Sequence, residues 1–358
     1  MVKALKVIGM ILLPLIVMAA GGMWYLYSNA TADAMARFLR DNPDRSTIQL
    51  VRNDSVLIAR GADRMMPLAS TVKIIIAIEY ARQATSGDID PNEWLDTIAL
   101  DPYYIPQTDG GAHPAWLRAM ASAGKLKGGK VTLREVARGM IDYSSNANSE
   151  YLMTRLGLEK INAGFPSLGI VSHEPLYPFV SALYVFQEKP DSLIKTMTLD
   201  EYRNTCRAVH TELPRRYSQL RKSFKMLPLK TQRIWSDRLP ASTAREYAAL
   251  MKKINDRTFF GDTLQLYLDE VMEGLLNNPA NRKWLKHAGT KGGSTASLLT
   301  QALYATSLTG DKTELAYFLN GLSVWESLQL QAAMNDFNLK ILTEPASRRT
   351  FVKMLSTP

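Results

Sequence analysis

The alternation of hydrophobic and polar positions predicts strands at both ends of the chain and helices between them. Five segments have the period-two alternation or the short apolar runs that are typical of strands: residues 47–51, 55–59, 287–291, 297–307 and 313–322. Residues 52–54, Arg-Asn-Asp, predict a tight turn between the first two. This order indicates that both ends of the chain contribute to one sheet, the α+β class rather than an alternating βαβ fold.

Capping residues and apolar periodicity mark the helices. Thr132, Thr198 and Thr243 are each followed three residues later by glutamate, the capping-box pattern of a helix start. The expected helices include residues 32–39, 70–83, 132–143, 147–156, 327–342 and 346–355. Residues 86–130 are richer in Gly, Pro and Asp, which favours loops with short helices. We therefore expect a mostly helical lobe, roughly residues 86–245, inserted into an α/β part.

The N-terminus has the pattern of a membrane-targeting segment. Lys3 and Lys6 precede an uncharged, mostly apolar stretch at residues 7–27 that ends in aromatic residues. About twenty apolar residues suffice to cross a bilayer, and a positive flank is typical of an N-terminus that stays inside. Small residues at 30–32 could instead be a signal-peptidase site. We expect an anchor or signal peptide at residues 1–31 and an extracytoplasmic domain at 32–358, either held at the cell membrane by a single span or secreted or periplasmic after cleavage.

Composition and charge exclude some classes of function. The 358 residues carry a formal net charge of +9, but the lysines and arginines are dispersed and no nucleic-acid-binding motif accompanies them. The basic stretch at residues 214–240 predicts either a solvated helical insertion or a surface that faces lipid or cell wall. Cys206 is the single cysteine, so no internal disulfide can form, and no thiol cluster or His-Glu-x-x-His pattern indicates a metal site. We expect neither nucleic acid nor a metal as a partner.

Ser70 and Lys73 are the first candidates for chemistry. They lie three residues apart in a predicted helix, and therefore on one face of it. A serine hydroxyl is a poor nucleophile at neutral pH, but a partly buried lysine with a lowered pKa can take its proton. The apolar run at residues 74–78 indicates a core helix, whose first turn lies at the edge of the packed interior. The pair alone is a weak signal, because Ser-x-x-Lys is common by chance.

Two further motifs strengthen this interpretation. The tripeptide Ser144-Ser145-Asn146 lies between two predicted helices, where side chains can point into a cleft. Residues 289–294, Gly-Thr-Lys-Gly-Gly-Ser, adjoin a predicted strand, and their glycines let a substrate lie close to the sheet edge. The order Ser-x-x-Lys, Ser-x-Asn, Lys-x-Gly resembles the three-motif signature of the penicillin-recognising serine hydrolases, which include class A β-lactamases and D-alanyl-D-alanine peptidases. The resemblance extends over residues 40–356.

This resemblance implies the β-lactamase/transpeptidase-like fold, a five-stranded antiparallel sheet flanked by helices with the active site in the crevice beside the helical lobe. Ser70 is then the acylated nucleophile and Lys73 its general base. Ser144 relays a proton to the leaving nitrogen, while Lys291 supplies positive charge to Ser144 and to a substrate carboxylate. The backbone N–H groups of Ser70 and Ser294 form the oxyanion hole. The residues that the resemblance places against the substrate are Asn146, Gly293 and Ser294.

The chain also departs from the family pattern at three points. Ser145 stands where aspartate is usual, at a position whose side chain normally points away from the substrate. Gly292 stands where a threonine or serine usually contacts the substrate carboxylate, which weakens the case for tight recognition of that group. The Glu-x-x-Leu-Asn loop, whose glutamate activates water for deacylation in class A enzymes, is not found. Glu174 is the nearest candidate for this role, although a glutamate in such a position is more often an ordinary carboxylate of a surface loop than a group that activates water.

The resemblance implies a hydrolase that opens an amide, the β-lactam ring, through an acyl-enzyme on Ser70. Two alternatives stay open: a D-alanyl-D-alanine carboxypeptidase (a penicillin-binding protein) acting on acyl-D-Ala-D-Ala peptides of peptidoglycan, and a sensor that binds β-lactams without turnover. A Ser-His-Asp hydrolase is disfavoured because no Gly-x-Ser-x-Gly elbow is present, and the spacing of an NTPase phosphate loop is absent. No cofactor is implied, and a monomer is expected.

Overall fold

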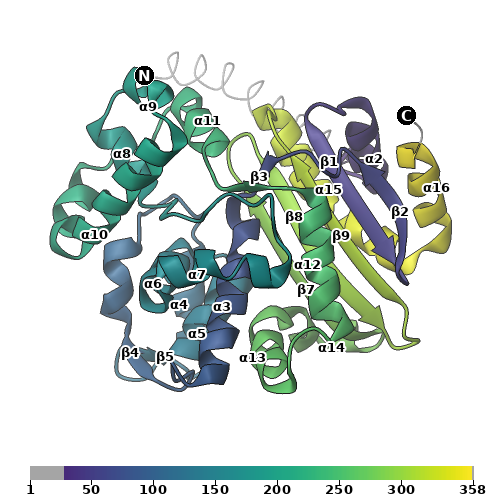
Figure 1. Ribbon diagram of the computed structural model, residues 1–358, viewed down its shortest axis with the longest axis horizontal. Coiled ribbons are helices and arrows are strands. Elements are labelled where there is room, and N and C mark those ends of the chain that lie inside the picture. Colours follow the sequence, from purple (N-terminus) through teal and green to yellow (C-terminus); the bar gives the residue numbers. More distant parts are fainter. Residues whose placement is uncertain (1–27, 357–358) are drawn as a thin grey trace, which may run out of the picture.

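The sheet is built from both ends of the chain. In the computed structural model, which describes residues 28–356, its five antiparallel strands are Ser46–Arg52 (β1), Ser55–Arg60 (β2), Leu285–Ser294 (β7), Leu299–Ser307 (β8) and Lys312–Leu319 (β9). They lie in the order β2-β1-β9-β8-β7 (Figure 1). β1 pairs with β9, so that Leu50 lies opposite Leu315. The predicted α+β architecture with one shared sheet is therefore confirmed.

Three helices from the two ends of the chain cover one face of this sheet: Ala32–Asp41 (α2), Val324–Thr343 (α15) and Pro345–Ser356 (α16). The side chain of Thr31 caps α2, and a complete capping box of Ser323 and Glu326 begins α15. Apolar side chains of these helices, such as Phe337 and Phe351, pack on sheet residues into one buried cluster. These helices thereby shield this face of the sheet from water, and the burial of its apolar surface stabilises the fold.

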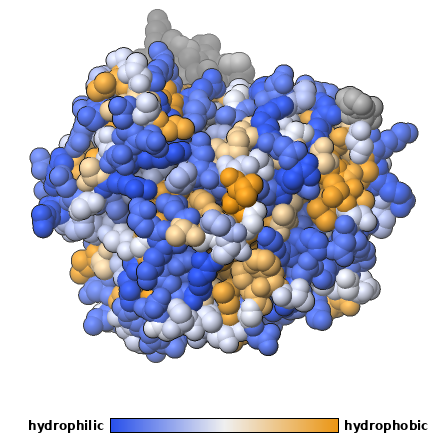
Figure 2. Space-filling view, in the orientation of Figure 1, coloured by the Kyte–Doolittle hydropathy of each residue, from blue (hydrophilic) through white to orange (hydrophobic). Residues whose placement is uncertain are grey.

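Ala244–Asp256 (α12) covers the opposite face of the sheet (Figure 1). Lys73–Ser86 (α3), which is buried along most of its length, lies between this part and the helical lobe. The other helices are Ala112–Ser122 (α4), Leu133–Asp142 (α5), Asn146–Leu156 (α6), Leu158–Ala163 (α7), Ala182–Glu188 (α8), Asp191–Thr196 (α9), Leu199–Ser223 (α10), Leu229–Asp237 (α11), Asp262–Met272 (α13) and Pro279–Arg282 (α14). The described residues also form four 3₁₀ helices: Ala69–Val72 (η1), Thr97–Tyr103 (η2), Pro166–Leu168 (η3) and Gly274–Asn277 (η4). Two short two-stranded sheets pair Met66–Pro67 (β3) with Ala241–Ser242 (β6) and Trp94–Asp96 (β4) with Lys130–Thr132 (β5). Figure 2 shows that the face seen in Figure 1 is mainly hydrophilic, with separate hydrophobic patches.

The basic stretch at residues 214–240 is helical for most of its length. α10 continues through Pro214 to Ser223, and α11 follows after a short loop. Arg221 donates a hydrogen bond to the carbonyl oxygen of Asp101, and its guanidinium lies 5.8 Å from the centroid of the Tyr104 ring. At least one cation of this stretch therefore holds α10 against the rest of the helical lobe.

The predicted membrane anchor or signal peptide falls on residues that the structure does not describe, apart from its last four positions. Within residues 28–356, no helix is both long enough and apolar enough to cross a bilayer.

Candidate active site

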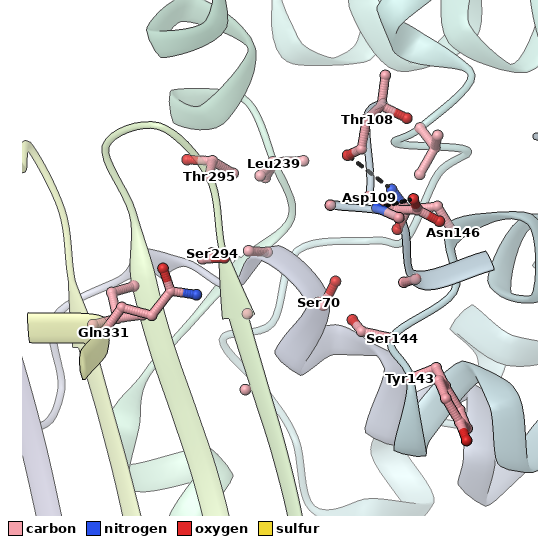
Figure 3. Close-up of a pocket in the computed structure, with 18 of the residues that line it drawn as sticks. Ser70, Thr108, Asp109, Tyr143, Ser144, Asn146, Leu239, Ser294, Thr295 and Gln331 are labelled. Atoms are coloured by element: carbon pink, nitrogen blue, oxygen red, sulfur yellow. Dashed lines mark hydrogen bonds between the residues drawn. The ribbon is translucent and has the colours of Figure 1, made fainter. Parts of the chain in front are cut away.

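Ser70 lies in the 3₁₀ turn η1, directly before the buried helix α3. The preceding residue, Ala69, has a φ of 45°, in the left-handed region that costs a non-glycine residue about 1–3 kcal/mol. Buried packing of Ala69, Thr71 and Val72 holds this conformation, whereas Ser70 is only half-buried. The turn therefore presents the Ser70 hydroxyl to the cavity that Figure 3 shows.

Lys73 is the first residue of α3, and its side chain is fully buried. Its Nζ donates hydrogen bonds to the carbonyl oxygen of Ser144 at 2.7 Å and to Oδ1 of Asn146 at 3.0 Å. Burial lowers the pKa of Lys73 well below its usual value, and the charge of Lys291 lowers this pKa further. The neutral amine, which can accept a proton, is thereby favoured. Within the described residues no hydrogen bond joins this amine to Ser70, and such contacts often tighten only when substrate binds.

Ser144 lies between two lysine amines. It occupies the turn between α5 and α6 with a φ of 64°. Its Oγ accepts a hydrogen bond from Nζ of Lys291 at 2.9 Å and lies 3.4 Å from Nζ of Lys73. Burial lowers the pKa of Lys291 to about 7. In Figure 3 the hydroxyls of Ser70 and Ser144 lie near each other at the cavity.

The side chain of Ser145 points into the helical lobe, whereas that of Asn146 lines the cavity. The Ser145 hydroxyl donates to Oδ1 of Asn148 at 2.8 Å, accepts from the Asn148 backbone N–H, and lies 3.0 Å from Nδ1 of the buried His113. Ser145 thus points into the helical lobe, away from the cavity, as predicted for this position. Asn146 instead lines the cavity, and its Nδ2 donates to the Thr108 carbonyl at 3.5 Å (Figure 3).

Gly293 allows β7 to approach the Ser70 turn. A Cβ atom on Gly293 would lie 2.5 Å from the Ser70 backbone nitrogen and 2.7 Å from Oγ1 of Thr300, so a larger residue does not fit. The strand edge, the Ser70 turn and the α5–α6 turn enclose a cavity of about 750 Å³, which Ser70, Ser144, Gly293 and Ser294 help to line. Three motifs that are far apart in the sequence therefore meet at one cavity.

The comparisons with known proteins agree with this geometry. A family model described as the beta-lactamase enzyme family matches residues 30–288, which is most of the chain. The chain belongs to the β-lactamase enzyme family. The match ends just before the Lys-Gly-Gly-Ser segment, so the third motif of this family member is identified by its place in the cavity. No curated protein matches the sequence.

Solved structures with a similar fold are distant in sequence. A β-lactamase from Sphaerobacter thermophilus is 16% identical, with a TM-score of 0.53 over 88% of this chain and 97% of that protein. A β-lactamase from Chitinophaga pinensis is 13% identical, with a TM-score of 0.52 over 86% and 98%. A mutant of PBP-A, an acyl-enzyme complex with penicillin G, is 16% identical, with a TM-score of 0.50 over 87% and 95%. These similarities confirm the β-lactamase-like fold.

Glu174, the candidate for water activation, is not brought to the cavity. Its Oε2 forms a 2.9 Å ion pair with Arg203 of α10 and accepts a hydrogen bond from the Ala241 backbone N–H. Among the described residues that line the cavity, the carboxylates are those of Asp109 and Asp142. Asp109 already accepts hydrogen bonds from the backbone N–H groups of Gly111 and His113. Within residues 28–356, no group of His, Cys, Asp or Glu side chains is arranged to hold a metal ion.

Glu150 is a structural member of the site that the sequence analysis missed. It is fully buried on α6 and accepts hydrogen bonds from the backbone N–H groups of Val180 at 2.9 Å and Ser181 at 3.3 Å. Nδ1 of His210 lies 3.1 Å from the same carboxylate. Phe179 and Val180 line the cavity, so Glu150 fixes an apolar wall of it. Its position one helical turn after Asn146 was the only available signal, and nothing in the sequence indicates the partner loop.

Proposed function

We propose that this family member is a serine hydrolase that opens an amide, such as a β-lactam ring, through an acyl-enzyme on Ser70. The main support is the arrangement of two buried amines on either side of Ser144, next to a half-buried serine. The lowered pKa of Lys73 favours the neutral amine that acyl transfer from serine requires. These features are those of a reaction centre, because a structural lysine is normally charged and solvated.

The proposed reaction uses these groups in two steps. Lys73 takes the hydroxyl proton as Ser70 Oγ attacks the carbonyl carbon, and the backbone N–H groups of Ser70 and Ser294 stabilise the oxyanion. Ser144 then gives its hydroxyl proton to the leaving nitrogen, assisted by the nearby Lys291, and regains a proton from the protonated Lys73 as the C–N bond breaks to leave an ester on Ser70. In the second step water attacks this ester, its oxygen stays with the acyl group, and its proton returns to Ser70 Oγ.

A second candidate is a penicillin-binding peptidase or sensor whose acyl-enzyme persists. The wall of the cavity at Phe179 and Val180 is apolar, and Glu174 is engaged by Arg203 on the helical lobe. Activation of the attacking water in the second step therefore depends on groups other than that glutamate. This observation favours slow release of the acyl group over rapid turnover.

Intact-protein mass spectrometry separates these functions. Wild-type protein and the Ser70→Ala variant are mixed with penicillin G at saturating concentration and sampled from seconds to hours. We expect one adduct on the wild type and none on the variant. Rapid return to the free mass, with hydrolysed penicillin in solution, identifies a β-lactamase; a lasting adduct identifies a binder or peptidase. Equal modification of both proteins would remove Ser70 from the mechanism.

The location of the protein belongs to the same proposal. The apolar residues 7–27 with their flanking lysines support export, with the domain held at the outer side of the cell membrane or released after cleavage. Fusion of a periplasmic reporter enzyme after residue 358 gives an active reporter if the domain is exported. An inactive reporter with intact fusion protein in the cells contradicts export.

A further inference from the structure

One wall of the cavity is formed by uncharged residues, several of which can form hydrogen bonds. Gly292 and Ser294 of β7, the following Thr295, and Gln331 and Asn335 of α15 are its polar lining residues, and Leu299 and Met334 line it beside them. Figure 3 shows the Gln331 carboxamide directed toward the end of β7. Each of these polar side chains carries a hydroxyl or an amide, and none of them carries charge. A substrate group that lies along β7 next to the scissile bond therefore meets uncharged donors and acceptors.

Gln301 lies behind this wall, next to Gly292, and does not itself line the cavity. It is opposite Gly292 in the β7–β8 ladder, and the residue is only 5% exposed. Its Nε2 donates to Oγ1 of Thr290 at 2.5 Å, and that hydroxyl donates onward to the Ala302 carbonyl at 3.5 Å. This chain of hydrogen bonds directs the amide nitrogen away and leaves the oxygen toward Gly292, 2.7 Å from where a Cβ of that residue would stand. The atom of Gln301 nearest to Gly292 is therefore a hydrogen-bond acceptor.

The charged residues that line the cavity also disfavour a negatively charged group. Among residues 28–356 no lysine or arginine lines the cavity, whereas Asp109 and Asp142 do. Lys291 is 4% exposed, and its amine already donates to Ser144 Oγ and to the Gly292 carbonyl. A carboxylate placed against β7 would lose water without a cation among the lining residues, and the Gln301 oxygen behind Gly292 adds negative partial charge, which is unfavourable. A carboxamide or ester avoids this cost, because neither group carries charge.

We infer that the substrate group bound between β7 and the α15 residues Gln331 and Asn335 is uncharged, a carboxamide or an ester, rather than a free carboxylate. This inference rests on the proposed acylation of Ser70 and adds the class of substrate to it. Compounds with a carboxylate at this position still react, but more slowly than their neutral counterparts.

The test is a matched pair of chromogenic cephalosporins that differ only in the group on the six-membered ring, a carboxylate or a carboxamide. For the wild-type protein we expect acylation, measured as kcat/KM and as adduct mass, to be at least tenfold faster with the carboxamide. Equal rates, or a preference for the carboxylate, overturn the inference and leave the Ser70 mechanism intact. If neither compound gives a Ser70-dependent adduct, the proposed function itself is wrong and this inference falls with it.

Gln301→Arg and Gln301→Met test the residue behind this wall. Arginine supplies the missing cation, whereas methionine of similar length removes the acceptor without adding charge. We expect the carboxylate-to-carboxamide rate ratio to rise at least fivefold in Gln301→Arg relative to Gln301→Met, with thermal unfolding confirming that both variants are folded. If both folded variants have the same ratio, Gln301 does not govern this choice and the inference is overturned at this residue. The wild-type pair of rates remains decisive if either variant does not fold.

Discussion

Replacement of Glu150 by glutamine tests whether a buried carboxylate organises the apolar wall of the cavity. The Glu150 carboxylate accepts hydrogen bonds from the Val180 N–H, from the Ser181 N–H and from the Ser181 hydroxyl. His210 lies on the same side as the two Ser181 donors. Glutamine has nearly the same shape but turns one acceptor oxygen into a donor N–H₂ group. Whichever way the amide turns, at least one buried donor then faces another donor.

The size of the effect follows from these contacts. A hydrogen bond to a charged group contributes about 1.5–3 kcal/mol, and a buried donor left without an acceptor costs about 1–3 kcal/mol. We therefore expect Glu150→Gln to lower the free energy of unfolding by about 2–4 kcal/mol. Because Phe179 and Val180 line the cavity, displacement of their segment also slows acylation of Ser70, by about tenfold or more.

The assay combines urea unfolding, followed by tryptophan fluorescence, with the rate of acylation by a fluorescent penicillin. Glu212→Gln is the matched control, because Glu212 forms an exposed ion pair with Arg216 on α10 and such pairs contribute about 0–1 kcal/mol. We expect the control to behave as wild type in both measurements. A Glu150→Gln protein that unfolds within about 0.5 kcal/mol of wild type and acylates at the wild-type rate would refute the reasoning.

Three further outcomes are expected. The rate of acylation should rise with pH as Lys73 loses its proton, because burial holds the pKa of Lys73 well below the usual lysine value, and it should fall again as Lys291 deprotonates near pH 7. In the Lys291→Arg variant, measured across the same pH range, the rate should no longer fall at high pH, because arginine stays charged. Gly293→Ala should slow acylation by about tenfold or more, since its Cβ would displace the Ser70 turn, and an unchanged acylation rate in stopped-flow measurements contradicts this. Burial raises the pKa of Glu314 to about 7, so the native protein keeps a proton that the unfolded chain loses above pH 4.5, and stability falls as the pH rises from 4.5 to 7. Glu314→Gln should therefore be more stable than wild type at pH 8 by up to about 3 kcal/mol, with little difference at pH 4, and urea unfolding at the two values checks this.

The elements whose formation depends on nearby residues were predicted well. The turn after β1 has Asn53 and Asp54 at φ values of 47° and 65°, as the Arg-Asn-Asp sequence suggested for a tight hairpin. The capping threonines begin their helices as expected, although only Thr198 forms the complete box. At Thr243 the expected partner Glu246 bonds instead to the backbone of residues 171–172. A distant loop thus overrides a local pattern.

The strand that carries the third motif was predicted too short. Residues 287–291 were expected as a strand, whereas β7 extends to Ser294, because glycines with little intrinsic preference for strands are held there by the β8 ladder. Gly293 is required in that position by its approach to the Ser70 nitrogen, a contact between segments more than two hundred residues apart.

The three short motifs, the order of strands and helices, and the family follow from the order of residues along the chain, since each depends on side-chain type and short spacing. The lowered pKa values of Lys73 and Lys291, the separation of Glu174 from the cavity, and the roles of Glu150 and Gln301 depend on the packed molecule. Burial, hydrogen-bond partners and the distance between charges arise when remote segments come together, and no local sequence pattern encodes them.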